Sequence, residues 1–352
     1  ELWKSDGTEA GTVMVKEISP GFNQYNGGAS YLTAVGDTLY FAADDGIHGQ
    51  ELWKSDGTEA GTVMVKDLYP GNDSSGSPNG GFARDGMTAI GDIVYFAGND
   101  GVNGWGLYKS DGTANGTEFI NIPVYQMYDL VALNDTLYFH ASPSGSMVDM
   151  KLYKSDGTAN GTVILKNITC PLQSLCKLTP VGDKLFFSND DGVHGQELWV
   201  SDGTVNGTVM VKDIAPIGGS KPFHTGAHVT PDPAVIGDTF FFHATSNGSS
   251  GWGLWKSDGT EAGTVLVSNM CCTAGSAPIV YGDSIFFVGS GGGIWRSDGT
   301  SSGTVLETNS VDPIHWGTPR MITGMGNTLY FAYGNPDPEL WAYNPTNLTL
   351  NT

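Results

Sequence analysis

A sixteen-residue segment, ELWKSDGTEAGTVMVK, occupies residues 1–16 and recurs unchanged at 51–66. Weaker copies begin at residues 106, 151, 197, 253 and 293, and a decayed eighth copy, ELWAYNPTNLT, covers 339–349. Successive copies start 40 to 56 residues apart, with a mean of about 48. Self-similarity at such a period is the signature of a repeat architecture. Because the repeat spans the whole chain, we expect a single domain, 1–352, without an internal linker.

A second motif alternates with the first. It reads GDTLYFA at 36–42, and six further copies begin at residues 91, 134, 182, 237, 282 and 326. Each repeat unit therefore contains four short segments rich in β-branched and aromatic residues, typified by LTAV, TLYFA, ELWKS and TVMVK. Gly-Asp and Asp-Gly pairs, which suit tight turns, separate these segments. We predict four strands per unit and essentially no helix.

The middle two segments of a unit carry apolar residues on both faces. Leu52 and Trp53 are adjacent, as are Tyr40 and Phe41, so in a strand their side chains point to opposite sides. A sheet with two buried faces must lie between neighbours. Four-stranded units at this period predict an all-β, seven-bladed β-propeller. A flat solenoid is the alternative, and it requires a more uniform period.

The two chain ends are expected to complete one blade together. The sequence contains seven copies of the second-strand motif and eight copies of the third-strand motif, so one third strand is surplus. We expect the N-terminal hairpin, 1–18, to join 320–333, so that the propeller is closed by pairing of the N- and C-terminal segments. Segment 339–352 is then an extra outer strand or a tail, or else it or residues 1–5 pair outside the regular blade. Strand addition to a neighbouring molecule would build a filament or layer.

The units resemble the ELWxxDGT repeat found in secreted and surface proteins. The resemblance covers essentially the whole chain, because Leu-Trp, Ser-Asp-Gly-Thr and a later Gly-Thr recur together. The Ser-Asp-Gly-Thr hairpin also resembles the Asp-box of sialidase-like propellers, a turn that is structural in that family. The resemblance implies an extracellular propeller and supplies no activity.

The charge balance restricts the partners. The chain has 16 Lys and Arg against 37 Asp and Glu, for a net charge of −21. Nucleic acids and anionic membranes both require a basic face, so neither is expected as a partner. No apolar run approaches the roughly 18 residues of a membrane helix, so no membrane insertion is expected. The remaining partners are further copies of the chain, which would give a homopolymer, or other extracellular proteins and glycans.

Two acidic loops carry the one metal hypothesis. DDGIHGQ (44–50) and DDGVHGQ (190–196) offer the carboxylates of Asp44, Asp45, Asp190 and Asp191, which are ligands that calcium accepts. The alternative is that Asp and Gly simply make the turn. The sequence contains no HExxH motif and no Cys/His cluster, so we predict no other metal site and no cofactor.

We predict that the chain is not an enzyme and has no catalytic residues. A sialidase-like site needs three converging arginines, whereas Arg296 replaces the lysine beside a repeat turn, leaving only Arg84 and Arg320. No nucleophile elbow or phosphate loop is present. A glycosidase pair of carboxylates is the less favoured alternative. Tryptophans at the repeated Leu-Trp position indicate blade packing, so Trp105, Trp252 and Trp316 are the candidates for ligand contact.

Cysteines and glycosylation motifs indicate the compartment. The cysteines permit local bridges Cys170–Cys176 and Cys271–Cys272, cross-pairing of the two loops, or free thiols. The N-x-S/T acceptors are Asn72, Asn115, Asn134, Asn160, Asn167, Asn206, Asn247 and Asn347. Together these residues predict a secreted or cell-surface glycoprotein. Because the sequence opens in mid-repeat, we expect it to be processed or part of a longer chain.

The predicted function is a non-catalytic structural or adhesive glycoprotein, acting as a subunit of an extracellular filament or layer. The alternative is a glycan- or protein-binding module that uses the variable loops of one propeller face. A glycoside hydrolase is the least favoured reading.

Overall fold

The computed structural model is all-β, and its described residues contain no α-helix. The described residues are 1–19, 28–75, 77–146, 149–169, 177–216, 234–246, 252–269, 278–288, 293–308, 320–325, 328–333, 339–344 and 349–351. Within these ranges no helix is long and apolar enough to cross a membrane. The chain divides into two compact units, 1–168 and 169–352, which are described separately.

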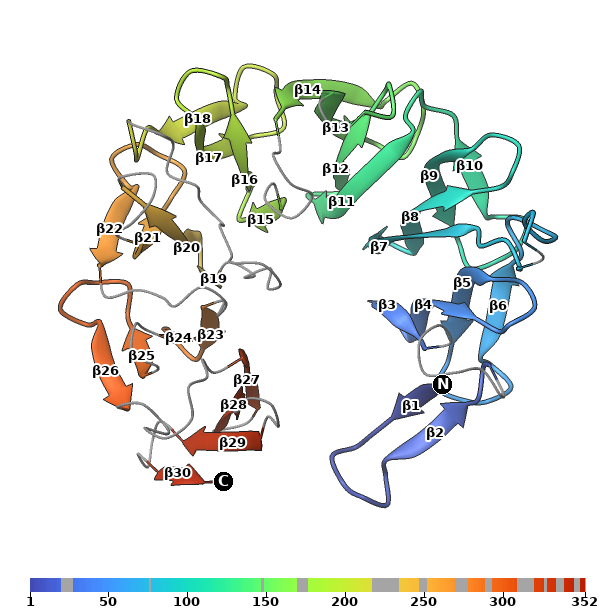
Figure 1. The fold of residues 1–352 in the computed structure, drawn as a ribbon, viewed down its shortest axis with the longest axis horizontal. Coiled ribbons are helices and arrows are strands. Elements are labelled where there is room, and N and C mark those ends of the chain that lie inside the picture. Colours follow the sequence, from blue (N-terminus) through green and yellow to red (C-terminus); the bar gives the residue numbers. More distant parts are fainter. Residues whose placement is uncertain are drawn as a thin grey trace. The chain divides into compact units, whose positions relative to one another are not determined.

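The first unit holds one hairpin and three four-stranded antiparallel sheets (Figure 1). Its strands are β1 (Leu2–Lys4) and β2 (Val13–Lys16); β3 (Ser30–Val35), β4 (Thr38–Asp44), β5 (Gln50–Ser55) and β6 (Val63–Lys66); β7 (Phe82–Ile90), β8 (Ile93–Asn99), β9 (Trp105–Ser110) and β10 (Glu118–Ile120); β11 (Gln126–Leu133), β12 (Thr136–Ser142), β13 (Met150–Ser155) and β14 (Val163–Ile168).

The second unit holds four more four-stranded antiparallel sheets. Its strands are β15 (Thr179–Val181), β16 (Lys184–Asp190), β17 (Gln196–Ser201) and β18 (Val209–Lys212); β19 (Ala234–Ile236), β20 (Thr239–Thr245), β21 (Trp252–Ser257) and β22 (Val265–Ser268); β23 (Ile279–Tyr281), β24 (Ser284–Val288), β25 (Ile294–Ser297) and β26 (Val305–Thr308); β27 (Arg320–Met325), β28 (Thr328–Tyr333), β29 (Glu339–Asn344) and β30 (Thr349–Asn351).

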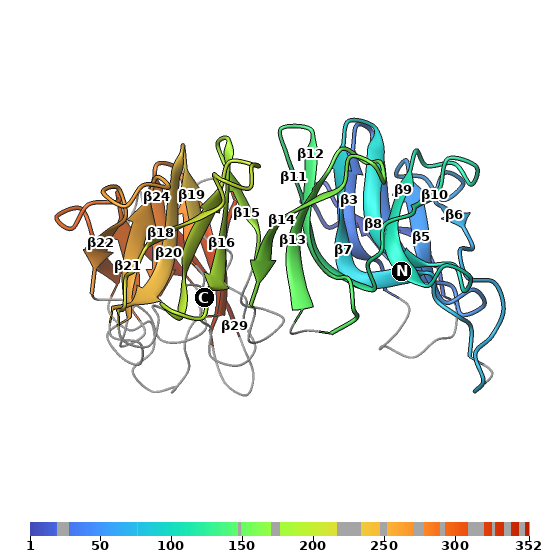
Figure 2. The ribbon, with the colours of Figure 1, turned by 90° about the horizontal axis from the view of Figure 1, so that it is seen from above.

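Each sheet is a meander whose strands neighbour one another in chain order, and within each unit the chain passes from one sheet to the next (Figure 2). Seven consecutive four-stranded antiparallel sheets of this kind form a β-propeller architecture. The predicted strand pattern is therefore confirmed: the GDTLYFA motif forms the second strand of each sheet and the ELWKS motif the third.

The third and fourth strands meet through a bulge that recurs from blade to blade. Leu52 pairs with Lys66 while Trp53 pairs with Met64, which leaves Val65 as the extra residue of the outer strand. A bulge bends a strand and redirects a side chain, and here it places Val65 in the core, where it is buried. The same shift occurs between the Leu-Trp residues of β1, β17 and β21, and between the corresponding residues of β13 and β25.

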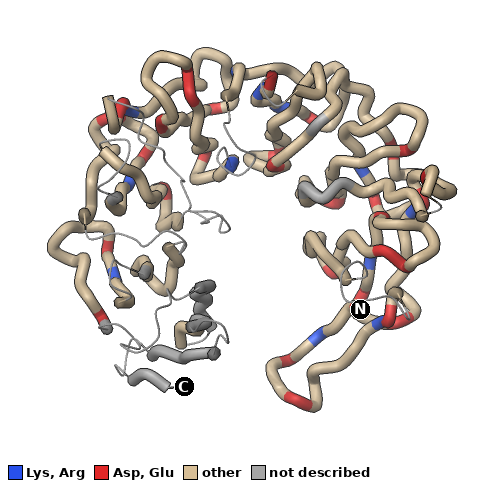
Figure 3. Tube along the Cα trace, viewed as in Figure 1, with Lys and Arg blue, Asp and Glu red and all other residues tan. Residues whose placement is uncertain are grey.

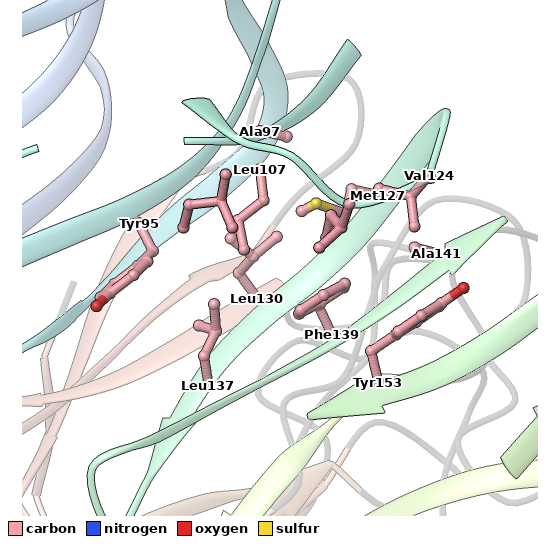
Figure 4. Packing of buried hydrophobic residues seen from close by; sticks show 12 residues of the cluster. Tyr95, Ala97, Leu107, Val124, Met127, Leu130, Leu137, Phe139, Ala141 and Tyr153 are labelled. Carbon is pink, nitrogen blue, oxygen red and sulfur yellow. The ribbon is translucent and has the colours of Figure 1, made fainter. Parts of the chain in front are cut away.

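The hydrophobic core lies between successive sheets rather than within one. One cluster joins Tyr40, Leu52 and Val65 of the β3–β6 sheet to Phe96 and Tyr108 of the next. Figure 4 shows the following interface, in which side chains of β8 and β9 meet those of β11, β12 and β13. Because each blade buries its faces against its neighbours, a single blade cannot form a core alone.

The structure does not show the predicted pairing of the chain ends. Among the described strands, β1 pairs with β2 alone, whereas β28 pairs with β29, which in turn pairs with β30. β29 and β30 are therefore the third and fourth strands of the last sheet rather than an extra strand or a tail, and β1, within residues 1–5, is the strand that pairs outside a four-stranded sheet. The reason is local: Phe331 pairs with Trp341 just as Phe41 pairs with Trp53, so the decayed repeat copy still supplies a matching edge.

Candidate functional site

The repeated Ser-Asp-Gly-Thr turn is the most frequent polar arrangement in the structure. In the copy that begins at Ser55, Asp56 Oδ1 accepts hydrogen bonds from the backbone N–H of Thr58 at 2.9 Å and from its hydroxyl at 2.7 Å. The Thr58 hydroxyl also accepts a bond from Gly61 N at 3.0 Å. Because the Asp56 carboxylate accepts hydrogen bonds from its own turn, it stabilises the hairpin.

A chain of hydroxyl groups closes the same turn from the side of the sheet. Thr62 donates to the Thr58 carbonyl at 2.6 Å, and its oxygen lies 2.7 Å from the Ser55 hydroxyl. Since a hydroxyl has one hydrogen to donate, Ser55 is the donor in that pair, and its oxygen accepts Gly57 N at 3.0 Å. The same bonds recur in all the copies that contain Ser-Asp-Gly-Thr, which begin at Ser5, Ser110, Ser155, Ser201, Ser257 and Ser297.

These turn carboxylates remain ionised. The Thr58 hydroxyl, followed by the Thr58 backbone N–H, holds the pKa of Asp56 below its ordinary value of 3.8. The pKa values of Asp6, Asp111, Asp156, Asp258 and Asp298 are lowered by the corresponding bonds. A carboxylate of this kind is a structural acceptor and is poorly suited to act as a general acid near neutral pH.

Lysines of the repeat join several blades to the turn of the next blade. From the fourth strand, Lys66 Nζ donates to the Thr117 carbonyl at 3.0 Å and Lys212 Nζ to the Thr264 carbonyl at 2.9 Å. From the third strand, Lys256 Nζ donates to the Gly299 carbonyl at 2.8 Å. Basic residues are few, and acidic positions are spread along both units (Figure 3). These repeat lysines are therefore part of the blade-to-blade contact rather than of a basic binding surface.

The acidic loops have a turn structure that uses their carboxylates. Asp45 Oδ1 accepts bonds from Ile47 N and His48 N, both at 2.9 Å, and Asp45 Oδ2 lies 2.7 Å from His48 Nδ1. The loop of 190–196 repeats this arrangement with Asp191 and His194. Among the described residues no group of three or more His, Cys, Asp or Glu side chains could hold a metal ion. Calcium binding at these loops stays an untested hypothesis.

An equivalent loop shows what the histidine does. In NDGVNGW, Asn103 replaces the histidine and its Nδ2 donates to Asp100 Oδ2 at 2.6 Å. Asp45 raises the pKa of His48 through their hydrogen bond, and Asp191 does the same for His194. Because an amide fills the same role, the histidine acts as a hydrogen-bond donor to the turn aspartate.

A buried glutamate, which sequence reasoning missed, fastens the connection between two blades. Glu51, at the start of the third strand, is fully buried, and its two carboxyl oxygens accept hydrogen bonds from Leu68 N at 3.2 Å and Gly81 N at 2.8 Å. Glu197 occupies the same place in another blade and accepts Ile214 N at 3.1 Å and Ala215 N at 3.2 Å. Burial raises the pKa of Glu51 to about 8, against the lowering effect of the backbone N–H groups of Leu68, Gly81 and Tyr69.

A glutamate with a raised pKa is a usual mark of a general acid. In Glu51 both oxygens face backbone donors of the same connection, and the side chain is shielded from solvent. The signal available in the sequence was the glutamate that precedes Leu-Trp in only some copies of the repeat. A charged residue beside core positions needs a buried partner.

Two further buried groups recur at one strand position. His140 and His243 are both buried, and burial lowers the pKa of His140 to about 3 and that of His243 to about 4. Both imidazoles are therefore neutral near pH 7. His140 Nδ1 lies 3.8 Å from Asp129 Oδ2, a separation that is too long for a hydrogen bond.

The predicted modification sites fall partly within the described residues. The side chains of Asn72, Asn115, Asn134, Asn160, Asn167 and Asn206 are all exposed. Asn247, Asn347 and the cysteines Cys170, Cys176, Cys271 and Cys272 lie outside the described residues. Glycosylation and cysteine pairing therefore stay predictions.

Of the predicted contact residues, the structure describes the side chains of Trp105 and Arg296. Trp105 is partly exposed at the start of β9, the side chain of Trp252 is not described, and Trp316 lies outside the described residues. Arg296 forms an ion pair with Glu307 of the neighbouring strand. The side chains of Arg84 and Arg320 are not described.

No family model matches this sequence, and no curated protein matches it. Solved structures do resemble it. For the computationally designed Ika8 protein the TM-score is 0.53 at 12% identity, covering 93% of this chain and 87% of that chain. For a prolyl endopeptidase the TM-score is 0.51 at 12% identity, with coverage of 92% and 48%.

A puromycin hydrolase resembles the chain with a TM-score of 0.50 at 16% identity, covering 93% of this chain and 53% of that chain. The chain thus spans about half the length of these two hydrolytic enzymes. At such identities the likeness concerns the fold alone, and the sites described above are those of this chain.

Proposed function

We propose that the chain is a non-catalytic structural or adhesive propeller module that acts outside the cell. A closed seven-bladed ring is part of this proposal, because closure would pack the first and last blades face to face, as the other blades pack, and would leave only short strand edges.

One observation carries the proposal: the carboxyl groups of the Ser-Asp-Gly-Thr turns, of the acidic loops and of the blade connections recur with the repeat instead of interrupting it. Asp56, Asp45 and Glu51 each have a counterpart in at least one other blade, and each is bonded to the backbone of a turn or connection. A catalytic site is unique to one place on a repeat scaffold and converges on a substrate. Groups that recur and are bonded internally instead support a role in holding the blades together.

Surface features favour a location outside the cell. All six acceptor asparagines in the described residues are exposed, so each can carry a glycan without displacing the core. The net charge of −21 favours solubility and opposes nonspecific contact with anionic surfaces.

The test combines location, mass and activity. Fractionation of the source cells should recover the chain from the medium or cell surface, and its intact mass should fall after enzymatic removal of N-glycans. The purified chain should turn over neither glycoside nor peptide substrates. Recovery only from the cell interior without a mass change overturns the extracellular role. Turnover that a single substitution abolishes overturns the non-catalytic role.

A second candidate function, protein binding, is favoured by apolar loop tips. Ile47, Val102 and Val193 occupy equivalent positions in the acidic loops and are 70%, 88% and 81% exposed. Trp105 lies three residues after Val102. Exposed apolar side chains on loops of a rigid scaffold suit a protein partner. Replacement of Val102 by Asp should then weaken adhesion to extracellular material of the source, whereas replacement of the exposed Thr113 by Ser on the opposite turn should not.

A further inference from the structure

The hairpin of β1 and β2 is half of a blade. Its sequence, residues 1–16, is identical to that of 51–66, which forms β5 and β6. Its turn has the same bonds, including Asp6 Oδ1 to Thr8 N at 2.9 Å and the Ser5–Thr12 hydroxyl pair at 2.7 Å. Leu2, Val15 and Ile18 are buried against Phe41 and Trp53 of the next sheet. The hairpin is thus correctly folded and packed on one side.

The identical hairpin, β5–β6, shows which kind of strand can pair with the edge of β1 that faces away from β2. β5 pairs with β4 in the register Leu39 to Ser55, Tyr40 to Lys54 and Phe41 to Trp53. The rings of Phe41 and Trp53 stack with their centroids 6.4 Å apart. In the described structure β1 has no such neighbour, and Trp3 is 55% exposed whereas Trp53 is 7% exposed.

The strand that fits this edge is β28. Residues 326–332 read GNTLYFA against GDTLYFA at 36–42. β28 already uses the expected register, because Leu329, Tyr330 and Phe331 pair with Tyr343, Ala342 and Trp341 of β29. A strand with this sequence and register would pair with β1 through Leu329 to Ser5, Tyr330 to Lys4 and Phe331 to Trp3.

The present partner of β28 is the weaker of the two hairpins. The copy ELWAYNPTNLT retains the Leu-Trp pair but lacks the aspartate and both glycines of the repeated turn. It therefore has no carboxylate in place of Asp6, which accepts two bonds from Thr8 in the β1–β2 turn. Turn chemistry contributes to hairpin stability, so displacement of β29–β30 from β28 costs less than displacement of a hairpin with the intact turn would.

We propose that β1 of one copy of this chain pairs with β28 of a second copy and replaces that copy's β29–β30 hairpin. The contact is heterologous, because it joins different surfaces of the two copies. A heterologous contact that does not close on itself repeats into a filament. The inference names the partner in the proposed structural role as a second copy of the chain. It rests on that proposed role, in which several copies of the chain assemble.

The experiment uses sedimentation velocity of the purified chain over a range of concentrations. Trp3→Lys places a charge at the edge of β1, which opposes strand addition. Met14→Lys is the matched control, since Met14 pairs directly with Trp3, is also exposed, and lies on the far edge of the hairpin. A third variant lacks 339–352, which leaves β28 without β29 while the rest of the chain is intact.

The expected result is concentration-dependent assembly of the intact chain and tighter assembly of the shortened chain. Trp3→Lys should weaken the association of the intact and of the shortened chain by about tenfold. This is the expected loss when a stacked cross-strand aromatic pair is removed and a charge is placed on the edge strand. Met14→Lys should leave the association unchanged. Circular dichroism that matches the intact chain shows that each variant is folded.

Three outcomes overturn the proposal. The shortened chain assembles no more tightly than the intact chain, or Met14→Lys weakens assembly as much as Trp3→Lys, or the shortened chain stays monomeric while Trp3→Lys lowers its Tm. The last outcome means that β1 reaches β28 within one molecule. Because assembly is measured on purified chain, its failure is distinct from a failure of the extracellular or non-catalytic role.

Discussion

Gly61 lies against Asp56 so closely that a β-carbon on Gly61 would stand 2.1 Å from Asp56 Oδ1. The corresponding glycines Gly11, Gly116, Gly161, Gly207, Gly263 and Gly303 meet the carboxylates of their own turns in the same way. The second glycine of SDGTxxGT is therefore required by the hydrogen-bonded aspartate, and not by backbone conformation.

Gly61→Ala should displace the Asp56 carboxylate and lower the free energy of unfolding by about 1–3 kcal/mol, as overpacking does. Gly57→Ala is a comparison with a different cause, since its φ is +85° and nothing lies within 4 Å of the added carbon, so its loss of about 1 kcal/mol would be conformational. Ala60→Ser, at an exposed position of the turn, is the control. Urea unfolding midpoints measure all three, and equal midpoints for Gly61→Ala and the control would refute the steric account.

The contact between Lys66 and the Thr117 carbonyl joins two blades. Lys66→Met retains most of the aliphatic stem and removes the charged donor, which should lower the free energy of unfolding by about 1–3 kcal/mol. Lys109→Met is the control, because Lys109 pairs with the exposed Glu118, at 3.3 Å, within its own blade, and such surface pairs contribute about 0–1 kcal/mol. If both variants unfold at the same urea concentration, the blade-to-blade bond contributes no more than a surface pair.

The pKa of Glu51 predicts the direction of a pH effect. Its folded value of about 8 exceeds its ordinary value of 4.5, so the folded state binds the proton more tightly than the unfolded state. The stabilising contribution is complete below about pH 4.5 and is lost as the pH rises towards 8. Between these limits the loss is on the order of a few kcal/mol.

Glu51→Gln should therefore flatten the decline of the Tm between pH 5 and pH 8, a window set by the two pKa values. Glu118→Gln is the control, since Glu118 is exposed on an outer strand and should leave the slope unchanged. A Glu51→Gln profile parallel to that of the unsubstituted chain would show that Glu51 stays ionised in the folded state at pH 5, held by Leu68 N and Gly81 N.

Strand order and type followed from sequence, because the period of Leu-Trp and GDTLYFA copies fixes which residues pair. The bulge at Leu52 and Trp53 did not, since an extra residue in TVMVK leaves no mark on a period-two pattern. The partner of β28 was also mispredicted: loss of the turn motif in 339–349 suggested a surplus strand, whereas retention of Leu340 and Trp341 preserves the register. Buried Glu51 was missed because its partners are backbone N–H groups, which no sequence motif displays.

His48 can be replaced by asparagine, the residue that occupies the equivalent loop position at Asn103. His48→Asn should leave the Tm at pH 7 nearly unchanged, because Asn103 bonds Asp100 in the equivalent loop. His48→Ala should lower it by removing the donor. The raised pKa of His48 means that its contribution is complete below 6.5 and is lost as the pH rises through the folded value. The asparagine variant should lack that pH dependence, and a loss of Tm as large as that of the alanine variant would contradict the shared role.

Asn115 and Thr117 belong to one glycosylation motif, yet the structure gives them different tasks. Asn115 is exposed, whereas Thr117 is buried, donates to the Thr113 carbonyl at 2.7 Å and lies 2.8 Å from the Ser110 hydroxyl. Asn115→Gln should therefore remove one glycan from the intact mass and leave the unfolding midpoint unchanged.

Thr117→Ala should remove the same glycan and also lower the free energy of unfolding by about 1–2 kcal/mol, because one buried and one partly buried hydrogen bond lose the Thr117 hydroxyl. Thr117→Ser retains both the hydroxyl and the acceptor motif, so its mass should keep the glycan and its midpoint should stay close to that of the unsubstituted chain. Intact-mass analysis and urea unfolding of the three variants, produced in the source organism, separate the two tasks. If none of them changes mass, Asn115 carries no glycan and the motif is only the turn sequence; if Thr117→Ala is as stable as Asn115→Gln, the hydroxyl network does not hold the hairpin.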